Sequence, residues 1–182
     1  AMAHADKTDD AHFPTYPHPG SAVLGAALPV AEREQRSGKE LIVAVVLGYD
    51  VMCRAVKAVD REWMHERGLH TASMCANFGA TAAACRLLRL KPEQICYALA
   101  FAGTQAAGLH TWREEEEHID KALARAGLPA RNGISAALWA HAGFTATPTI
   151  FEGAHNFIRS FSEKAHPDEI AHDLGVRYEI LD

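Results

Sequence analysis

Acidic and imidazole side chains are concentrated in the first twenty residues, where many groups that could do chemistry lie close in sequence. They are His4, Asp6, Asp9, Asp10, His12 and His18. Carboxylates and imidazoles serve as general acids, general bases or metal ligands. Because Pro14, Pro17 and Pro19 rule out a regular helix, residues 1–20 are expected to form a loop.

Three interpretations of this loop remain open from its residues alone. It could be a solvated surface loop, an acid/base site, or a metal site built from His4, Asp9, His12 and His18. The spacing matches no helix-borne ligand motif such as His-Glu-x-x-His, which weighs against the metal site.

Two further candidates lie in the middle of the chain. His70 stands at a predicted helix start, where it could face a cavity beside free backbone N–H groups that attract an anion, or could simply cap the helix. Segment 103–108 contains small residues but lacks the Gly-Lys-Ser/Thr ending of a phosphate loop, so we expect it to pack against a neighbouring helix.

Segment 112–121 contains four consecutive glutamates, Glu114 to Glu117, followed by Asp120 and Lys121. A run of glutamates is typical of a solvated face. Lys121 is a cation beyond that run and, taken by itself, would be interpreted as a surface lysine.

Apolar side chains recur at spacings of three and four, which predicts helices that must position these groups. The expected helical ranges are 21–28, 39–56, 72–90, 92–108 and 130–141, with short helices near 147–152 and 167–174. Pro29 is expected to kink or interrupt the first helix. Segment 176–181 is expected to be extended. The predicted fold class is all-α, with an active-site loop at 1–20 and helices across 21–175.

Length and charge limit the classes of function. The chain has 182 residues, of which 48% are hydrophobic, enough for one domain with a true core. The net charge of −5 implies no basic face, so neither nucleic acid nor an anionic membrane surface is an expected partner.

Cysteines and apolar runs point to a soluble, cytoplasmic protein. The cysteines form no Cys-x-x-Cys pair, and all are expected to be reduced core residues: Cys53, Cys75, Cys85 and Cys96. The longest apolar run, residues 41–48, is too short to cross a bilayer. No secretory signal pattern opens the chain.

Several short pieces, taken in chain order, make the sequence similar to the MmgE/PrpD family. They are His4 with Asp9-Asp10-Ala11-His12, His18-Pro19-Gly20, Gly48-Tyr49-Asp50, Gly68-Leu69-His70-Thr71, Phe78-Gly79-Ala80, Gly103-Thr104-Gln105 with Gly108, and Pro129-Ala130-Arg131-Asn132-Gly133. No single piece is specific, but the ordered set covers nearly the whole chain. The family includes 2-methylcitrate dehydratase, cis-aconitate decarboxylase and iminodisuccinate epimerase.

The resemblance implies a two-domain enzyme with a helical domain, a smaller α/β lid and an active site between them. This chain resembles only part of the helical domain, with the lid absent, so we expect the piece alone to be inactive. The resemblance also implies a homodimer formed through the helical domain, a small carboxylic acid as substrate, and neither a cofactor nor a metal.

Residue roles follow from the same resemblance. The expected catalytic residues are His70, His18, Asp9 and Lys121, and the expected substrate-binding residues are Asp10, His12, Gln105 and Arg131. The chain departs from the family pattern at Lys7, where many members have aspartate, and at Ala11, where many have threonine. The loop before His18 is one residue longer, and Lys121 aligns only with an insertion before Gly127. These departures leave the substrate open.

The expected function is therefore a lyase-type enzyme, most simply a dehydratase, that acts on a small di- or tricarboxylic acid by metal-independent acid/base catalysis. Such a site needs a base with a pKa near neutrality and cations around the acid groups. The alternatives are a decarboxylase or epimerase of the same family, a metal-dependent enzyme built on the His/Asp loop, and a non-catalytic binding or assembly domain.

Overall fold

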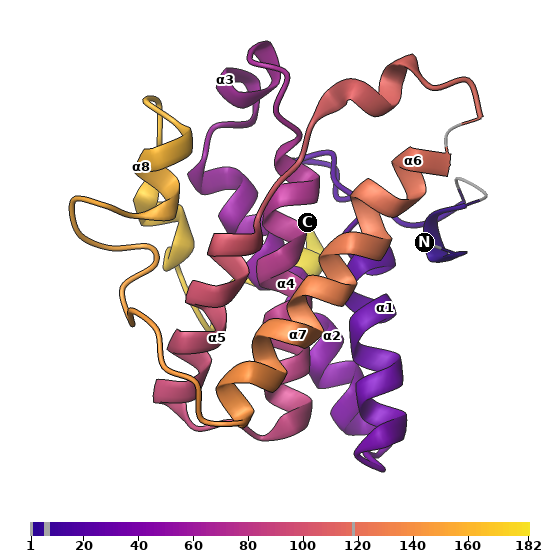
Figure 1. Cartoon of the computed structure of the whole chain (residues 1–182), viewed down its shortest axis with the longest axis vertical. Helices are drawn as coiled ribbons and strands as arrows, with labels where there is room; N and C mark the ends of the chain where they lie inside the picture. The colour runs from indigo at the N-terminus through magenta and orange to yellow at the C-terminus, as the bar shows by residue number, and fades with distance from the viewer. Residues whose placement is uncertain (1, 6–7, 118) are drawn as a thin grey trace.

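One helix, α4 (Thr71–Leu88), runs through the middle of the molecule in the computed structural model, which describes residues 2–5, 8–117 and 119–182 (Figure 1). Every residue of α4 except Arg86 is buried. A helix that is covered on all sides cannot carry a polar stripe, and the alanine-rich sequence of α4 meets this requirement. The neighbouring helices α1, α2, α5 and α7 pack against it.

The remaining elements are helices and helical turns. They are η1 (Met2–His4), α1 (Pro19–Arg33), α2 (Gly38–Ala58), α3 (Arg61–Glu66), α5 (Pro92–Gln105), η2 (His110–Glu114), α6 (Ile119–Ala122), η3 (Leu123–Gly127), α7 (Leu128–His141), α8 (Phe157–Phe161), η4 (Pro167–Ile170) and η5 (Glu179–Leu181). Within the described ranges the only β-structure is two isolated bridges, so the predicted all-α class is confirmed.

The sequence explains where the long helices begin. A capping box precedes α2: the Ser37 hydroxyl accepts the Glu40 N–H, and the Glu40 carboxylate accepts the Ser37 N–H. Proline occupies the first turn of α1 and of α5, where no intrahelical N–H is needed. The predicted interruption at Pro29 is wrong, because α1 continues to Arg33. Pro29 lies on the exposed face, where water can hydrate the carbonyl that loses its partner.

Two other local predictions are wrong, and the short helix predicted near 167–174 is confirmed over its first part. Segment 147–152 forms bends and turns, and the helix α8 begins later, after the Asn156 side chain accepts the Arg159 N–H. Only Pro167–Ile170 is helical within 167–174. Segment 176–181 is not extended but ends in the turn η5. The periodicity also missed α3, which Asp60 caps by accepting the Trp63 N–H.

The C-terminal segment is fixed to α2 by buried charges. Arg54, only 2% exposed, donates to the carbonyl oxygens of His172 and Arg177. The fully buried Glu179 donates its backbone N–H to Asp50 and places its carboxylate 2.5 Å from Lys57 Nζ.

All four cysteines are free, as predicted, and three of them are fully buried. Burial raises the pKa of the Cys53, Cys75 and Cys85 thiols, so these side chains act as small core residues. Across the described part of the chain, no helix combines the length and apolarity that crossing a membrane requires.

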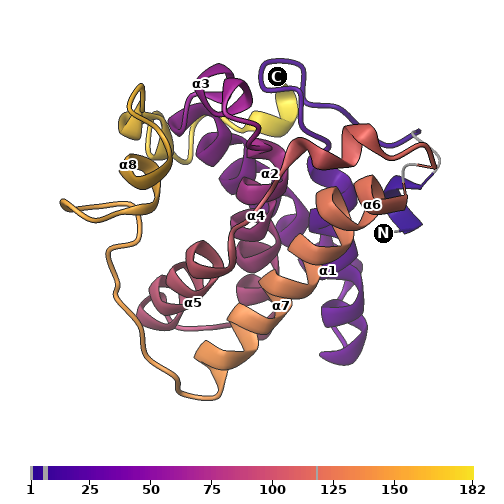
Figure 2. The ribbon, with the colours of Figure 1, turned by 45° about the horizontal axis from the view of Figure 1, so that its top comes forward.

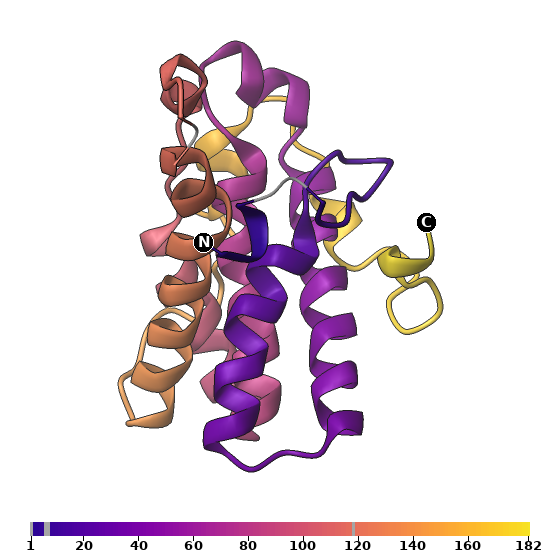
Figure 3. The ribbon, with the colours of Figure 1, turned by 90° about the vertical axis from the view of Figure 1, so that its right-hand side faces the viewer.

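Large apolar side chains remain exposed on α1 and α2, which lie side by side and antiparallel (Figure 3). They are Leu24, Leu28, Ile42, Val43 and Leu47. The homodimer expected from the sequence stays a prediction.

The helices α2 and α4 approach each other closely at two glycines. A Cβ atom on Gly48 would lie 2.7 Å from the carbonyl oxygen of Gly79 and 2.6 Å from Val23 Cγ1. A Cβ atom on Gly79 would lie 2.6 Å from the carbonyl oxygen of Gly48. Because backbone atoms cannot move aside without separating the helices, this contact admits only glycine on both sides.

We expect Gly48→Ala to lower the free energy of unfolding by about 1–3 kcal/mol, because overpacking outweighs the roughly 1 kcal/mol by which alanine favours a helix. Urea unfolding measures the change. Gly38→Ala is the matched control, since a Cβ at Gly38 meets no atom within 4 Å and should leave stability unchanged or slightly raised. Equal effects of the two substitutions would contradict the close contact.

Candidate active site

A cavity of about 130 Å³ lies at the N-terminal end of α4, where the opening loop, α3 and η2 gather at one end of the bundle (Figure 2). We call it the α4 cavity. Its lining includes three arginines, Arg61, Arg113 and Arg125, and three histidines, His65, His70 and His110. None of the described residues that line it carries a carboxylate. The cavity is therefore suited to an anion.

Backbone pairing brings two of these histidines together. The His70 N–H donates to the Gly108 carbonyl, and the His110 N–H donates to the Gly68 carbonyl, around a bridge between Leu69 and Leu109. The ring centroids of His70 and His110 are consequently 4.8 Å apart. A Cβ on Gly108 would lie 2.7 Å from the His70 carbonyl oxygen, so this approach requires glycine.

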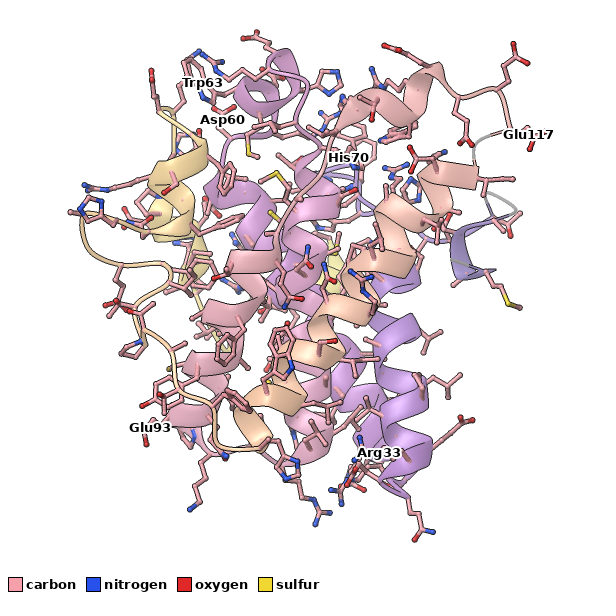
Figure 4. The ribbon with its side chains drawn as sticks, in the orientation of Figure 1. Arg33, Asp60, Trp63, His70, Glu93 and Glu117 are labelled. Atoms are coloured by element: carbon pink, nitrogen blue, oxygen red, sulfur yellow. The ribbon has the colours of Figure 1, made fainter. Side chains whose placement is uncertain are left out.

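His70 is buried at the first residue before α4, on the inner side of the cavity (Figure 4). Its Nδ1 atom lies 2.6 Å from Ser73 Oγ, which leaves Nε2 available for a ligand. Burial, reinforced by the positive charge of Arg125 and the neighbouring His110, lowers the pKa of His70 to about 2. The imidazole is therefore neutral at physiological pH, but its pKa lies well below the near-neutral value expected of the base.

His110 has a similar environment. Burial, the adjacent His65 and the nearby arginines lower its pKa to about 4. The His65 and His110 ring centroids are 4.3 Å apart, and Arg113 Nη1 lies 3.5 Å from His65 Nε2. An anion bound among these groups would reverse the effect of the arginines and favour protonation of the imidazoles.

Arg125 reaches the cavity from a π-helical turn. The elements α6, η3 and α7 form one continuous helix, and its π turn, Leu123–Gly127, contains Arg125. Such turns insert one extra residue and often occur at functional sites. Burial lowers the pKa of Arg125, and its Nε atom has no hydrogen-bond partner among the described residues. The Arg125 guanidinium lies 5.6 Å from the centre of the Trp112 ring.

The opening loop places a second polar cluster beside Arg125. His4 Nδ1 lies 2.5 Å from Asp9 Oδ2, and His18 Nδ1 lies 3.4 Å from Asp9 Oδ1. The Asp9 carboxylate acts electrostatically on Arg125, which links this cluster to the α4 cavity. His18 also lies 2.7 Å from the Asp10 carbonyl oxygen.

Among the residues that the structure describes, two groups of side chains have the donor atoms of a metal site. His4, Asp9 and His18 form one, and His12, Glu179 and Asp182 form the other; within each group the donor atoms lie within 4.8 Å of one another. In both, a cationic side chain acts on a carboxylate: Arg125 acts electrostatically on Asp9, and Lys57 is in direct contact with Glu179. This competition disfavours a metal ion in either group.

Two predicted substrate-binding residues have structural contacts. Both Asp10 carboxylate oxygens accept the Gly20 N–H, at 3.0 and 3.1 Å, in the first turn of α1. Burial and the neighbouring Asp10 raise the pKa of Tyr49. His12 is buried, with Nδ1 2.6 Å from Thr15 Oγ1 and Nε2 3.5 Å from Glu179. His12 lines none of the cavities described here, so its predicted role in substrate binding has no direct geometric support.

The other predicted residues divide between two places. Lys121 Nζ lies 5.5 Å from the centre of the Trp112 ring and thus beside the α4 cavity. Gln105 and Arg131 line a separate, neighbouring cavity of about 360 Å³ together with Asn132. Asp9 and Asp10 also line an open hollow near Tyr49 and Ile180. The structure therefore gathers His70, Lys121, Asp9 and His18 around Arg125 and Trp112. The catalytic roles of these residues stay predictions.

Sequence reasoning missed most of the positive charge at this site. The omitted residues are Arg61, His65, His110, Arg113 and Arg125. The run His110-Thr111-Trp112-Arg113 combines cationic, imidazole and aromatic groups and could have been singled out. Arg125 lies in an alanine-rich stretch with no local signal, and only the π turn brings it inward. The family aspartate position, Lys7, lies outside the described residues, as does Asp6.

The all-helical fold and a cation-lined cavity beside a buried histidine define a class of protein: a helical domain with a cavity suited to an anion. The MmgE/PrpD N-terminal domain matches residues 1–170, and the chain therefore belongs to the MmgE/PrpD family.

Named relatives are similar to this chain at low identity. The cis-aconitate decarboxylase-like protein oryM of Aspergillus oryzae is 28% identical over 98% of the chain. Cis-aconitate decarboxylase of Aspergillus terreus is 28% identical over 90% of it. The chain spans only 39% and 34% of the lengths of these relatives.

The lowered pKa of His70 predicts a pH-dependent loss of stability. The unfolded chain takes up a proton near pH 6.5, whereas the folded chain resists it down to about pH 2, so stability falls as the pH drops through this window. His70→Gln removes the effect. Both proteins should lose stability when the pH is lowered from 7 to 5. The loss in free energy of unfolding should be about 2 kcal/mol smaller in His70→Gln than in the wild type.

Urea unfolding at both pH values measures this difference. His155→Gln, in an exposed loop, is the control and should behave as the wild type does. Parallel losses of stability in the wild type and in His70→Gln would show that His70 is not held neutral.

Proposed function

We propose that this chain forms the helical half of a lyase-type enzyme that acts on a small di- or tricarboxylic acid. The observation that carries the proposal is the composition of the α4 cavity, where three arginines surround a neutral, buried His70 and no described lining residue is acidic. Removing a proton or a carboxyl group beside a carboxylate builds negative charge, which such a cluster of cations stabilises.

Each group has a distinct role in this proposal. His70 Nε2 is the general base or acid, and Ser73 Oγ orients the ring through Nδ1. The arginines hold substrate carboxylates by charge-assisted hydrogen bonds, and Lys121 adds positive charge at the edge of the cavity. His18 and Asp9 border Arg125 and form the second proton-transfer pair.

The names of the relatives make decarboxylation of cis-aconitate the first reaction to test. Dehydration of a hydroxy-acid such as 2-methylcitrate uses the same cations, a base for the proton on carbon and a proton donor for the departing hydroxyl group. Decarboxylation releases CO2 and needs a proton donor for the carbon that CO2 leaves. His70 and the His18–Asp9 pair are the two proton-transfer groups in both reactions, and no step in the scheme uses a metal ion. A non-catalytic binding domain is the rival role, and it predicts acid binding without turnover.

The test is turnover by the longest natural protein that contains this chain, with cis-aconitate, citrate, 2-methylcitrate and iminodisuccinate as substrates. We expect chelator-resistant turnover of one of them, and a loss of about 10²–10⁴ in kcat for His70→Gln, the range for a positioned proton-transfer group. Arg33→Gln, at the opposite end of the bundle, should retain full activity (Figure 4).

Turnover that stops with chelator would reject the metal-independent mechanism. A His70→Gln variant as active as the wild type would reject His70 as the acid/base group. Acid binding with no turnover of any substrate would support the non-catalytic role.

A further inference from the structure

The first turn of α4 opens into the α4 cavity without a side-chain cap. The N-cap residue His70 makes no side-chain hydrogen bond to the helix backbone, and Thr71 and Ala72 both line the cavity. The first N–H groups of a helix have no intrahelical acceptor. With the helix dipole, they form a partial positive charge that favours an anion.

Two buried donors beside this turn also lack partners. Trp112 is only 9% exposed, lines the same cavity, and its Nε1 atom has no hydrogen-bond partner among the described residues. Arg125 is half-buried and lines the same cavity, and its inaccessible Nε atom likewise has no hydrogen-bond partner among the described residues. A buried donor left unpaired costs roughly 1–3 kcal/mol, more when it is charged. Both donors lie where a ligand oxygen would satisfy them.

The charges around the cavity favour an anion over any neutral ligand. Arg61 and Arg113 line it in addition to Arg125, and His65, His70 and His110 supply imidazoles but no negative charge. The carboxylate that acts electrostatically on Arg125 is that of Asp9, which is also in contact with His4. Arg125 is thus left with a positive charge that the described residues compensate only in part.

We propose that the first turn of α4, Arg125 and the indole N–H of Trp112 form a subsite for one carboxylate of the substrate. This subsite rests on the proposed function and specifies where the acid is anchored. Arg61 and Arg113 provide for a second carboxylate of the same molecule. The cavity is smaller than the roughly 300–1,000 Å³ of drug-sized pockets, so the acid must be compact.

Nuclear magnetic resonance of the ¹⁵N-labelled 182-residue chain tests this directly, since its three tryptophans give separate indole N–H signals. The probes are propane-1,2,3-tricarboxylate, malonate, acetate and inorganic phosphate at constant ionic strength. We expect the two polycarboxylates to shift the Trp112 signal downfield, as a new hydrogen bond requires, and to leave Trp63 and Trp139 unchanged. Trp112→Phe identifies the signal by its disappearance.

Two variants separate binding from folding. Arg125→Gln should weaken polycarboxylate binding at least tenfold, about the effect of losing one charge-assisted hydrogen bond. Its thermal midpoint without anion should stay the same or rise, because the substitution removes a buried cation with an unpaired donor. A merely structural arginine would instead lower that midpoint. Arg33→Gln removes the same positive charge from an exposed side chain, and this variant should bind polycarboxylates as the wild type does.

The outcomes discriminate clearly. No change of the Trp112 signal with any probe, or equal binding by Arg125→Gln and the wild type, overturns the subsite. Binding of inorganic phosphate in preference to both polycarboxylates overturns its assignment to a carboxylate. Polycarboxylate binding at this subsite, with no turnover by the longest natural protein that contains this chain, would reject the lyase function and leave the subsite standing.

Discussion

The close contact between α2 and α4 is the constraint on which the rest of the structure depends. Gly48 and Gly79 face each other with no room for a side chain on either. Because the backbones approach this closely, neighbouring helices can cover α4 on all sides. The small side chains of α4 then leave few voids between the helices. Because α4 is enclosed by other helices, the position of its N-terminus is fixed by this packing. The packing therefore also fixes the position of His70, the residue before its first turn.

That fixed N-terminus accounts for the electrostatics of the α4 cavity. His70 stands at the start of a fully buried helix, which explains both its loss of solvent and its lowered pKa. The glycine at position 108 lets a second chain segment pair with residues 68–70 and brings His110 to the same place. The π turn then adds Arg125 from the far side. Helix packing, more than the loops, therefore determines the position of the charged groups.

The sequence predicted most of the fold and about half of the candidate site, for physical reasons that particular residues show. Helices α2 and α4 have long stretches of apolar residues at helical spacing, so the sequence predicted that both segments are helical. Segment 176–181 was misassigned because its conformation depends on Asp50 and Arg54, more than a hundred residues earlier. Asp9, His18 and His70 were candidates from their residue types and positions, and the resemblance assigned catalytic roles to them and to Lys121. Arg125 was not, because its inward position comes from a π turn that no local pattern indicates.

A cation inside a folded protein reduces its stability unless its hydrogen-bond donors have partners. This loss of stability helps to distinguish arginines that hold the fold together from arginines that bind a ligand. Arg54 is only 2% exposed, and it is paired with Asp50 and two carbonyl oxygens that fix the C-terminal segment. Arg125 is half-buried, and its inaccessible Nε atom has no hydrogen-bond partner among the described residues; the indole Nε1 atom of Trp112 is in the same state. A buried donor without a partner requires an explanation, and a ligand oxygen in the cavity that both side chains line supplies one. The contrast between two arginines of one fold is thus the strongest physical argument that the α4 cavity is a binding site.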